Sequence, residues 1–187
     1  MSVTLSKLNN LRSKQKGNFS VEFAIVGLFF SLLIVFSGDV IIKLSIKGKL
    51  DRLSYSLVNV LKERTQLYSE DYQITPNEAR GMMTIGGNSL SRTLSTYDPT
   101  KFGALVEELT FRGISAPNPQ KEYRFGGITC NVSKPLSELQ HLSVITSWER
   151  QASLYRVTFC YETDNWIGDL LGTEFTRVSS SSVMIGR

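Results

Sequence analysis

Residues 17–42 read GNFSVEFAIVGLFFSLLIVFSGDVII, and the apolar run inside this stretch decides how the chain folds. No charged side chain occurs between Glu22 and Asp39. An α-helix rises about 1.5 Å per residue, so residues 23–42 extend for roughly 30 Å, the thickness of a hydrocarbon core. The sequence therefore predicts one membrane-spanning helix over 23–42.

A charged pair lies at the end of this segment. Lys43 follows Asp39 by one helical turn, in the acid-before-base order that favours an ion pair. Such a pair can lie at headgroup depth at little cost. We interpret Asp39 as an interfacial acid, and an intramembrane ion or proton site is the alternative.

The helical pattern continues beyond the apolar run. Leucine and valine recur at helical spacing between 50 and 61, and the charged side chains of this half lie elsewhere around the helix, at Lys47, Lys49, Arg52, Lys62 and Glu63. We expect one helix over 18–64, apolar on all sides in its first half and packed on a water-soluble domain in its second. A secretory signal peptide cleaved before Gly38 is the alternative, which the returning apolar pattern disfavours.

Length and charge restrict the class of protein. The chain has 187 residues, enough for one domain of ordinary size and an accessory segment. Four of its 21 basic side chains lie in residues 1–17, which contain no acid, and the remaining 17 equal the 17 acidic side chains in number. Because this lacks the one-sided basic surplus that phosphate binding uses, we expect no nucleic-acid binding.

The pattern after residue 64 predicts an α+β domain. Thr75, Pro76 and Glu78 form a capping-box pattern that predicts a helix over about 76–94. LYRVTFCYET at 154–163 alternates and predicts a half-buried strand, with Cys160 opposite the aromatic side chains. FTRVSSSSVMIGR at 175–187 predicts a terminal strand exposed on one side.

Two further strands are expected. One covers 108–112 and is preceded by a short helix or strand, and a smaller one covers 128–132 and contains Cys130. Helix first and strands later indicate the α+β class, with a long N-terminal helix that passes from the membrane onto a small antiparallel sheet.

The chain has two cysteines, Cys130 and Cys160, which lack the CxxC spacing and the histidines of a zinc site. We predict a disulfide between them, which suits an extracytoplasmic domain, and two buried free thiols are the alternative. Basic residues flank the apolar run on both sides, so charge alone leaves the orientation open. The predicted disulfide favours a cytoplasmic N-terminus.

The sequence indicates no catalytic activity. His141 is the single histidine, and its neighbours form no catalytic pattern. No phosphate loop, GxSxG or HExxH motif occurs. Trp148 and Trp166 are expected in the core or at its rim. We therefore predict no enzyme, no catalytic residue, no metal site and no cofactor.

The segment KQKGNFSVEFAIVGLFF at 14–30 resembles a type IV prepilin processing site. A short basic leader ends at Gly17, and Glu22 would be the fifth residue of a mature chain that begins at Asn18. The segment is most similar to pseudopilins of the tight-adherence (Tad, or Flp) pilus, in which an aromatic residue, here Phe23, follows the glutamate. Asn18 departs from the aromatic or Met that begins most type IV pilins, which points toward this branch.

The C-terminal part resembles the TadF type of minor pseudopilin in the stretch LYRVTFCYETDNWIGDLLG and the serine-rich last strand. TadE-like proteins are a neighbouring family with the same N-terminal pattern. The resemblance implies a minor pseudopilin that acts in assembly of a Tad pilus for surface adherence. A membrane-anchored periplasmic sensor or adaptor and a secreted protein with a signal peptide are the alternatives.

The resemblance also implies a processing route and partners. A prepilin peptidase would cleave after Gly17, giving a leader 1–17, a long helix 18–64 and a periplasmic domain 65–187. The chain would cross the bacterial inner membrane once. Its partners would be the peptidase, other Tad pilins and pseudopilins, the inner-membrane assembly platform and membrane lipid.

Glu22 is costly where the helix enters lipid and should have a partner. Cleavage would create one, because the new amine of Asn18 would lie four residues earlier on the same helix face. The resemblance implies that this glutamate matches subunits during assembly. A snorkelling acid without a specific partner is the alternative.

Overall fold

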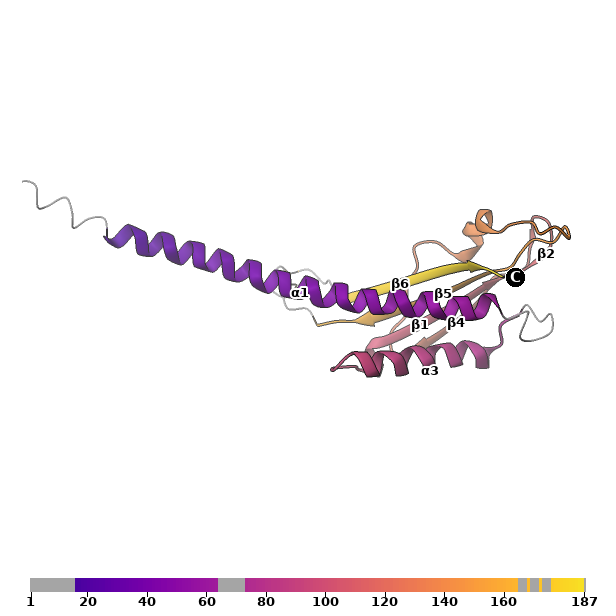
Figure 1. The fold of residues 1–187 in the computed structure, drawn as a ribbon, viewed down its shortest axis with the longest axis horizontal. Coiled ribbons are helices and arrows are strands. Elements are labelled where there is room, and N and C mark those ends of the chain that lie inside the picture. Colours follow the sequence, from indigo (N-terminus) through magenta and orange to yellow (C-terminus); the bar gives the residue numbers. More distant parts are fainter. Residues whose placement is uncertain (1–15, 64–72, 165–167, 169–171, 173–175, 187) are drawn as a thin grey trace, which may run out of the picture.

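The protein combines one long helix with a small antiparallel sheet, as Figure 1 shows. The computed structural model describes residues 16–63, 73–164, 168, 172 and 176–186, with side chains from residue 19 onward. Most of the expected leader and Trp166 therefore lie outside the described residues. The predicted α+β class is confirmed.

Helix α1 (Lys16–Lys62) contains 47 residues, which makes it about 70 Å long. Its first half projects from the domain, and its second half lies along the sheet (Figure 1). The single long helix expected over 18–64 is confirmed up to Lys62. We call the end of the domain from which α1 projects the near end, and the end where α1 finishes the far end.

Four antiparallel strands form the main sheet in the order β4-β1-β5-β6. Strands β1 and β5 are central, and β4 and β6 are the edges. A short hairpin of strands β2 and β3 lies at the far end. The bounds are β1 (Phe102–Leu109), β2 (Phe111–Gly113), β3 (Ala116–Pro117), β4 (Lys121–Gly126), β5 (Leu154–Glu162) and β6 (Arg177–Ile185).

The main core lies between the sheet and the helices, on what we call the helix face. The alternation predicted for β5 is confirmed, because Tyr155, Val157 and Phe159 point into this core while Cys160 points to the opposite back face. The predicted terminal strand is β6, most of whose residues are partly or fully exposed. The prediction that β5 is half-buried is wrong, however, because the loop after β4 covers the back face and leaves Arg156, Thr158 and Cys160 at most 4 % exposed.

Helix α3 (Pro76–Thr93) begins with the predicted capping box. The Glu78 N–H donates to the Thr75 hydroxyl, and the Thr75 N–H donates to the Glu78 carboxylate at 2.8 Å. Gly86 lies inside the helix and allows it to approach the sheet closely, since a Cβ there would lie 2.9 Å from Phe159 Cζ. The helix expected over about 76–94 is confirmed.

The strand expected over 108–112 was placed too late in the chain. Strand β1 ends at Leu109, and Phe111 already belongs to the separate hairpin. All eight residues of β1 are buried, because this strand lies between β4 and β5 and is covered on both faces. Its buried acids, Glu107 and Glu108, interrupt the apolar pattern that would have marked it as a central strand.

The small strand expected over 128–132 is a loop. Strand β4 ends at Gly126, where a φ of 107° turns the chain, and the Gly127 N–H donates to the Phe102 carbonyl at 2.9 Å. The chain then crosses the back face, where Ile128 and Val132 pack against a small core of Leu105, Cys130 and Cys160. Left-handed backbone at glycine, rather than β propensity, sets this path.

The back face also buries an ion pair. The Arg156 guanidinium donates from Nε and Nη2 to the fully buried Glu107 carboxylate, with the Nη2 contact at 2.5 Å. Arg156 also donates to the Lys134 carbonyl, and the Gln120 amide donates to Glu107, both at 2.8 Å. These bonds compensate the desolvation of two charges and hold the loop to the sheet.

Candidate functional site

The first half of α1 exposes its apolar side chains. The helix is long and apolar enough to cross a membrane, and 6 % of its most apolar 18-residue window is buried. A surface of this extent needs lipid or other helices around it. The exposed large side chains are Phe19, Val21, Phe23, Ile25, Val26, Leu28, Phe29, Phe30, Leu32, Leu33, Ile34, Val35, Phe36, Ile41 and Ile42.

The predicted processing residues lie in the first turns of α1. Gly17 and Asn18 fall in the first turn, where the structure describes the backbone. Glu22 and Phe23 follow with exposed side chains, and the Phe23 ring stacks on Phe19 with centroids 6.4 Å apart. Position 22 lies one helical turn after position 18, so both positions share a face.

The predicted charged pair marks the end of the exposed half. Lys43 Nζ lies 2.6 Å from Asp39 Oδ2, and both side chains are mostly buried. One turn further, Lys47 Nζ lies 3.2 Å from Asp51 Oδ1, and this pair is half exposed. The predicted ion pair is confirmed, and a carboxylate bonded to lysine fits an interfacial acid better than an ion or proton site.

Beyond Lys43 the same helix packs on the sheet. Its buried apolar side chains repeat at helical spacing and join the main core together with β5. This half of α1 therefore behaves as an ordinary amphipathic helix. The buried members are Ile46, Leu50, Leu57, Val58 and Leu61.

A polar contact lies inside this apolar interface. Ser54 is fully buried, and its hydroxyl lies 3.1 Å from that of Ser180 and 2.9 Å from that of Ser182. Serines on the helix face of β6 thus satisfy a buried hydroxyl of α1. The contact fixes which residues of the helix and the strand lie opposite each other.

A disulfide joins Cys130 to Cys160, the pairing that the sequence predicted. Cys130 lies in the loop after β4, and Cys160 lies in the central strand β5. Both residues are buried on the back face, with their Cα atoms 5.6 Å apart. The bond therefore ties the loop over the back face to the middle of the sheet.

Polar contacts hold the near end of the domain together. The Asp98 carboxylate accepts bonds from the Thr100 hydroxyl at 2.6 Å and the Thr100 N–H at 2.8 Å, and these bonds lower the pKa of Asp98. Lys101 donates to Asp164 at 2.9 Å, a contact that raises the pKa of Lys101. These contacts fix the short helix η1 (Pro99–Lys101) just before β1.

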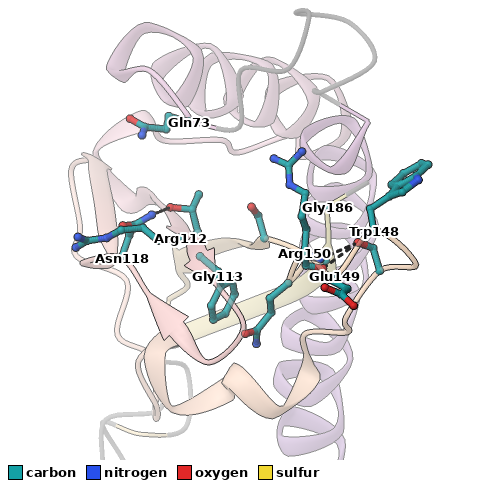
Figure 2. A pocket seen from close by; sticks show the side chains of 14 residues that line it. Gln73, Arg112, Gly113, Asn118, Trp148, Glu149, Arg150 and Gly186 are labelled. Atoms are coloured by element: carbon teal, nitrogen blue, oxygen red, sulfur yellow. Dashed lines mark hydrogen bonds between the residues drawn. The ribbon is translucent and has the colours of Figure 1, made fainter.

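Figure 2 shows a cleft of about 730 Å³ at the far end, beside the β2–β3 hairpin. Its polar groups bond mainly to one another: Arg112 Nε donates to Asn118 at 2.7 Å, and the Arg150 N–H donates to the Thr146 hydroxyl at 3.3 Å. Trp148, expected in the core or at its rim, points outward and is 82 % exposed. The described lining contains no histidine or cysteine.

The single histidine of the sequence was the other candidate for a catalytic residue. His141 is exposed in the short helix η2 (Leu136–Leu142). Within the described part of the chain, no three His, Cys, Asp or Glu side chains gather as metal ligands would.

Sequence reasoning missed the buried Glu107, Arg156 and Ser54. Glu107 and Arg156 are direct cross-strand partners in the β1–β5 register, which the residue pattern does not specify. The four-serine run at 179–182 was the one available signal for the polar contact with Ser54.

Comparison with known proteins agrees with this architecture. A family model described as "TadF: Putative tight adherence pilin protein F" matches residues 10–187, nearly the whole chain. No curated protein and no solved structure matches the chain. Pilins are structural proteins rather than enzymes, and one long apolar N-terminal helix fits anchoring in a membrane. The chain belongs to the TadF family of tight adherence pilin proteins and is a Tad pilus-associated protein.

Proposed function

We propose that this chain is a minor pseudopilin that acts in assembly of a Tad pilus for surface adherence. The observation that carries the proposal is α1, whose exposed apolar half continues without a break into a half packed on the sheet. One helix thus joins a lipid-compatible segment to a folded domain. A subunit built this way can exchange lipid for the helices of other subunits while its domain stays folded.

The proposed anchor is the span 23–42 in the inner membrane, with the N-terminus in the cytoplasm and residues 65–187 in the periplasm. The Asp39–Lys43 pair, whose side chains are mostly buried and bonded to each other, would then lie at the periplasmic interface. The disulfide would lie in an oxidising compartment, which supports this orientation.

Processing by a prepilin peptidase after Gly17 completes the proposal. Gly17 offers no side chain between the basic leader and the helix, which leaves its peptide bond unhindered. Cleavage would give Asn18 a free amine one turn before Glu22. Pairing of the Glu22 carboxylate with this amine, or with that of a neighbouring subunit, would reduce the cost of a carboxylate near lipid.

The first experiment is N-terminal sequencing of the protein purified from membranes. We expect the wild type to begin at Asn18, Gly17→Trp to stay full length, and Gly17→Ala to be affected less. Gly27→Trp is the matched control, because Gly27 lies in the same helix with open space around it, and we expect it to be processed normally. A start at Met1 would favour an anchored sensor or adaptor, and a start at Gly38 a secreted protein.

The second experiment separates assembly from processing at Glu22. Glu22→Gln should keep the helix in the membrane and most of the cleavage, yet abolish pili and surface adherence. Glu22→Asp shortens the side chain by one methylene and should retain part of the function. Normal pili in Glu22→Gln cells would mean that the carboxylate is a tolerated interfacial charge. Loss of cleavage in this variant would instead indicate that the peptidase recognises Glu22.

A further inference from the structure

Strand β6 is an edge strand with little of the usual protection of an edge. Among the described strands it pairs with β5 alone, and after Arg177 at its start residues 178–185, VSSSSVMI, contain no charge, proline or glycine. Exposed edges normally carry such residues because unpaired backbone groups recruit other strands. The opposite edge, β4, carries Lys121, Glu122 and Arg124, whose charges disfavour pairing with a strand of like charge but not with an uncharged one.

We propose that β6 of one subunit pairs with β4 of a second copy of this chain, so that the sheet continues from subunit to subunit. This inference rests on the proposed function in one respect, namely that neighbouring copies stand in one membrane with their α1 helices in the same direction. Strand polarity and edge chemistry then select β4 as the partner.

The first step concerns the direction of β6 relative to α1. Ser54 contacts Ser180 and Ser182, and Lys62, eight residues later in the helix, lies with Met184 and Ile185 around one hollow. Helix and strand therefore run in the same direction. If α1 crosses the membrane, the strands of the sheet therefore run along the same axis as α1.

The second step concerns the direction of the two edges. Strand β5 is antiparallel to both β1 and β6, so β1 and β6 point the same way. Strand β4 is antiparallel to β1 and therefore to β6. Moving a copy sideways without turning it brings its β4 against β6 as an antiparallel neighbour, whereas antiparallel pairing of β6 with β6 would invert one copy in the membrane.

The chemistry of the two edges is compatible. Leu105 and Glu107 of the back face pair with Arg124 and Glu122, so these β4 side chains also lie on the back face, where both are exposed. Cys160 and Thr158 pair with Ser179 and Ser181, which places these exposed serines on the same face.

Neutral hydroxyls can accept bonds from a guanidinium and donate bonds to a carboxylate. A row of serines therefore accommodates both signs of charge without repulsion. Because the two edges differ, the contact is heterologous and can repeat along an assembly.

The test is cysteine cross-linking between two differently tagged copies expressed in one cell. One copy carries Ser179→Cys or Ser181→Cys, and the other carries Glu122→Cys or Arg124→Cys. All four positions are exposed, and two positions on each strand allow for a shift in register. Under mild oxidation of intact membranes, we expect at least one of the four combinations to give several-fold more mixed disulfide dimer than the control.

The control pairs the β6 variant with Ser91→Cys, an exposed position on α3 rather than on an edge strand. No mixed dimer above this control in all four combinations, with each variant present in membranes and its native disulfide intact, would overturn the proposal. Dimers formed by the β6 variants alone would also overturn it, because they would join β6 to β6.

N-terminal sequencing of the cross-linked dimer separates this inference from the proposed function. A mixed dimer that begins at Met1 would support the edge contact while contradicting processing after Gly17. A wild-type start at Asn18 without any mixed dimer would contradict the edge contact alone.

Discussion

The two halves of α1 differ in their side chains and in their surroundings. Leu33 in the first half is 43 % exposed, whereas Leu50 in the second half is fully buried against the sheet. The first half is apolar on every side, and the second half restricts its apolar residues to one stripe. The boundary lies at Asp39 and Lys43, where the first charged pair occurs.

This difference shows that the number of apolar residues and their distribution around a helix together indicate what will cover it. An all-round apolar surface suits lipid or a bundle of helices, and a stripe suits one folded partner. The second half should therefore determine the stability of the domain, while the first half should determine where the domain is held. Three predictions test this division, and a fourth tests the polar contacts at the near end of the domain.

The largest effect is expected from Leu50→Ala. Removing a fully buried leucine should lower the free energy of unfolding of the domain by about 4 kcal/mol, because it leaves a cavity between α1 and the sheet. Leu33→Ala is the matched control in the exposed half and should cost less than about 0.5 kcal/mol. Urea unfolding in detergent micelles measures both, and equal losses would contradict the division.

Removal of the disulfide should act on the second half of α1 through the sheet. Replacing Cys130 and Cys160 by serine should cost about 3 to 4 kcal/mol, from the loop entropy of the unfolded chain. In hydrogen exchange, amides of residues 46–62 should lose protection while those of 23–38 keep theirs. A loss of protection in both segments would show that the two halves are stabilised together.

Ser54→Ala tests whether the polar contact contributes to the packed half. It should cost about 1 kcal/mol, because it removes bonds to the hydroxyls of Ser180 and Ser182. Ser37→Ala is the control, since the Ser37 hydroxyl donates to the Leu33 carbonyl of its own helix at 2.8 Å. If Ser54→Ala lowers the free energy of unfolding no more than Ser37→Ala does, the serine contact fixes the register of α1 on β6 without stabilising the fold.

The smallest effect concerns pH at the near end. Bonds from Thr100 hold the pKa of Asp98 below its ordinary value of 3.8, so the ionised form stabilises the folded state. This contribution is complete above the ordinary value and is lost as the pH falls through the lowered pKa. The melting temperature of the wild type should fall toward that of Asp98→Asn over this acid range, and a constant difference would contradict it.

The sequence predicted the features that depend on local pattern. The long helix, the capping box at Thr75 and the alternation along β5 follow from periodicity or from short motifs, and the disulfide follows from the count of two cysteines. These features need no knowledge of which strands are neighbours. The family resemblance likewise rested on short stretches of residues and agrees with the family model.

Features that depend on tertiary neighbours could not be predicted. Carboxylates are usually exposed, yet Glu107 is buried because Arg156 lies opposite it on β5. Residues 128–132 have strand-like composition, but the turn at Gly126 directs them across the back face. In both places, a contact between distant segments outweighs local preference.

Because α1 and β6 run in the same direction, a pull on α1 toward the membrane loads their interface in shear. The buried side chains from Ile46 to Leu61 and the Ser54 hydroxyl would then resist together, instead of separating one after another as in peeling. Forced unfolding depends on the rate of rupture, so this geometry favours mechanical resistance beyond what equilibrium stability provides. The domain is thus oriented to bear tension along the axis of its own anchor.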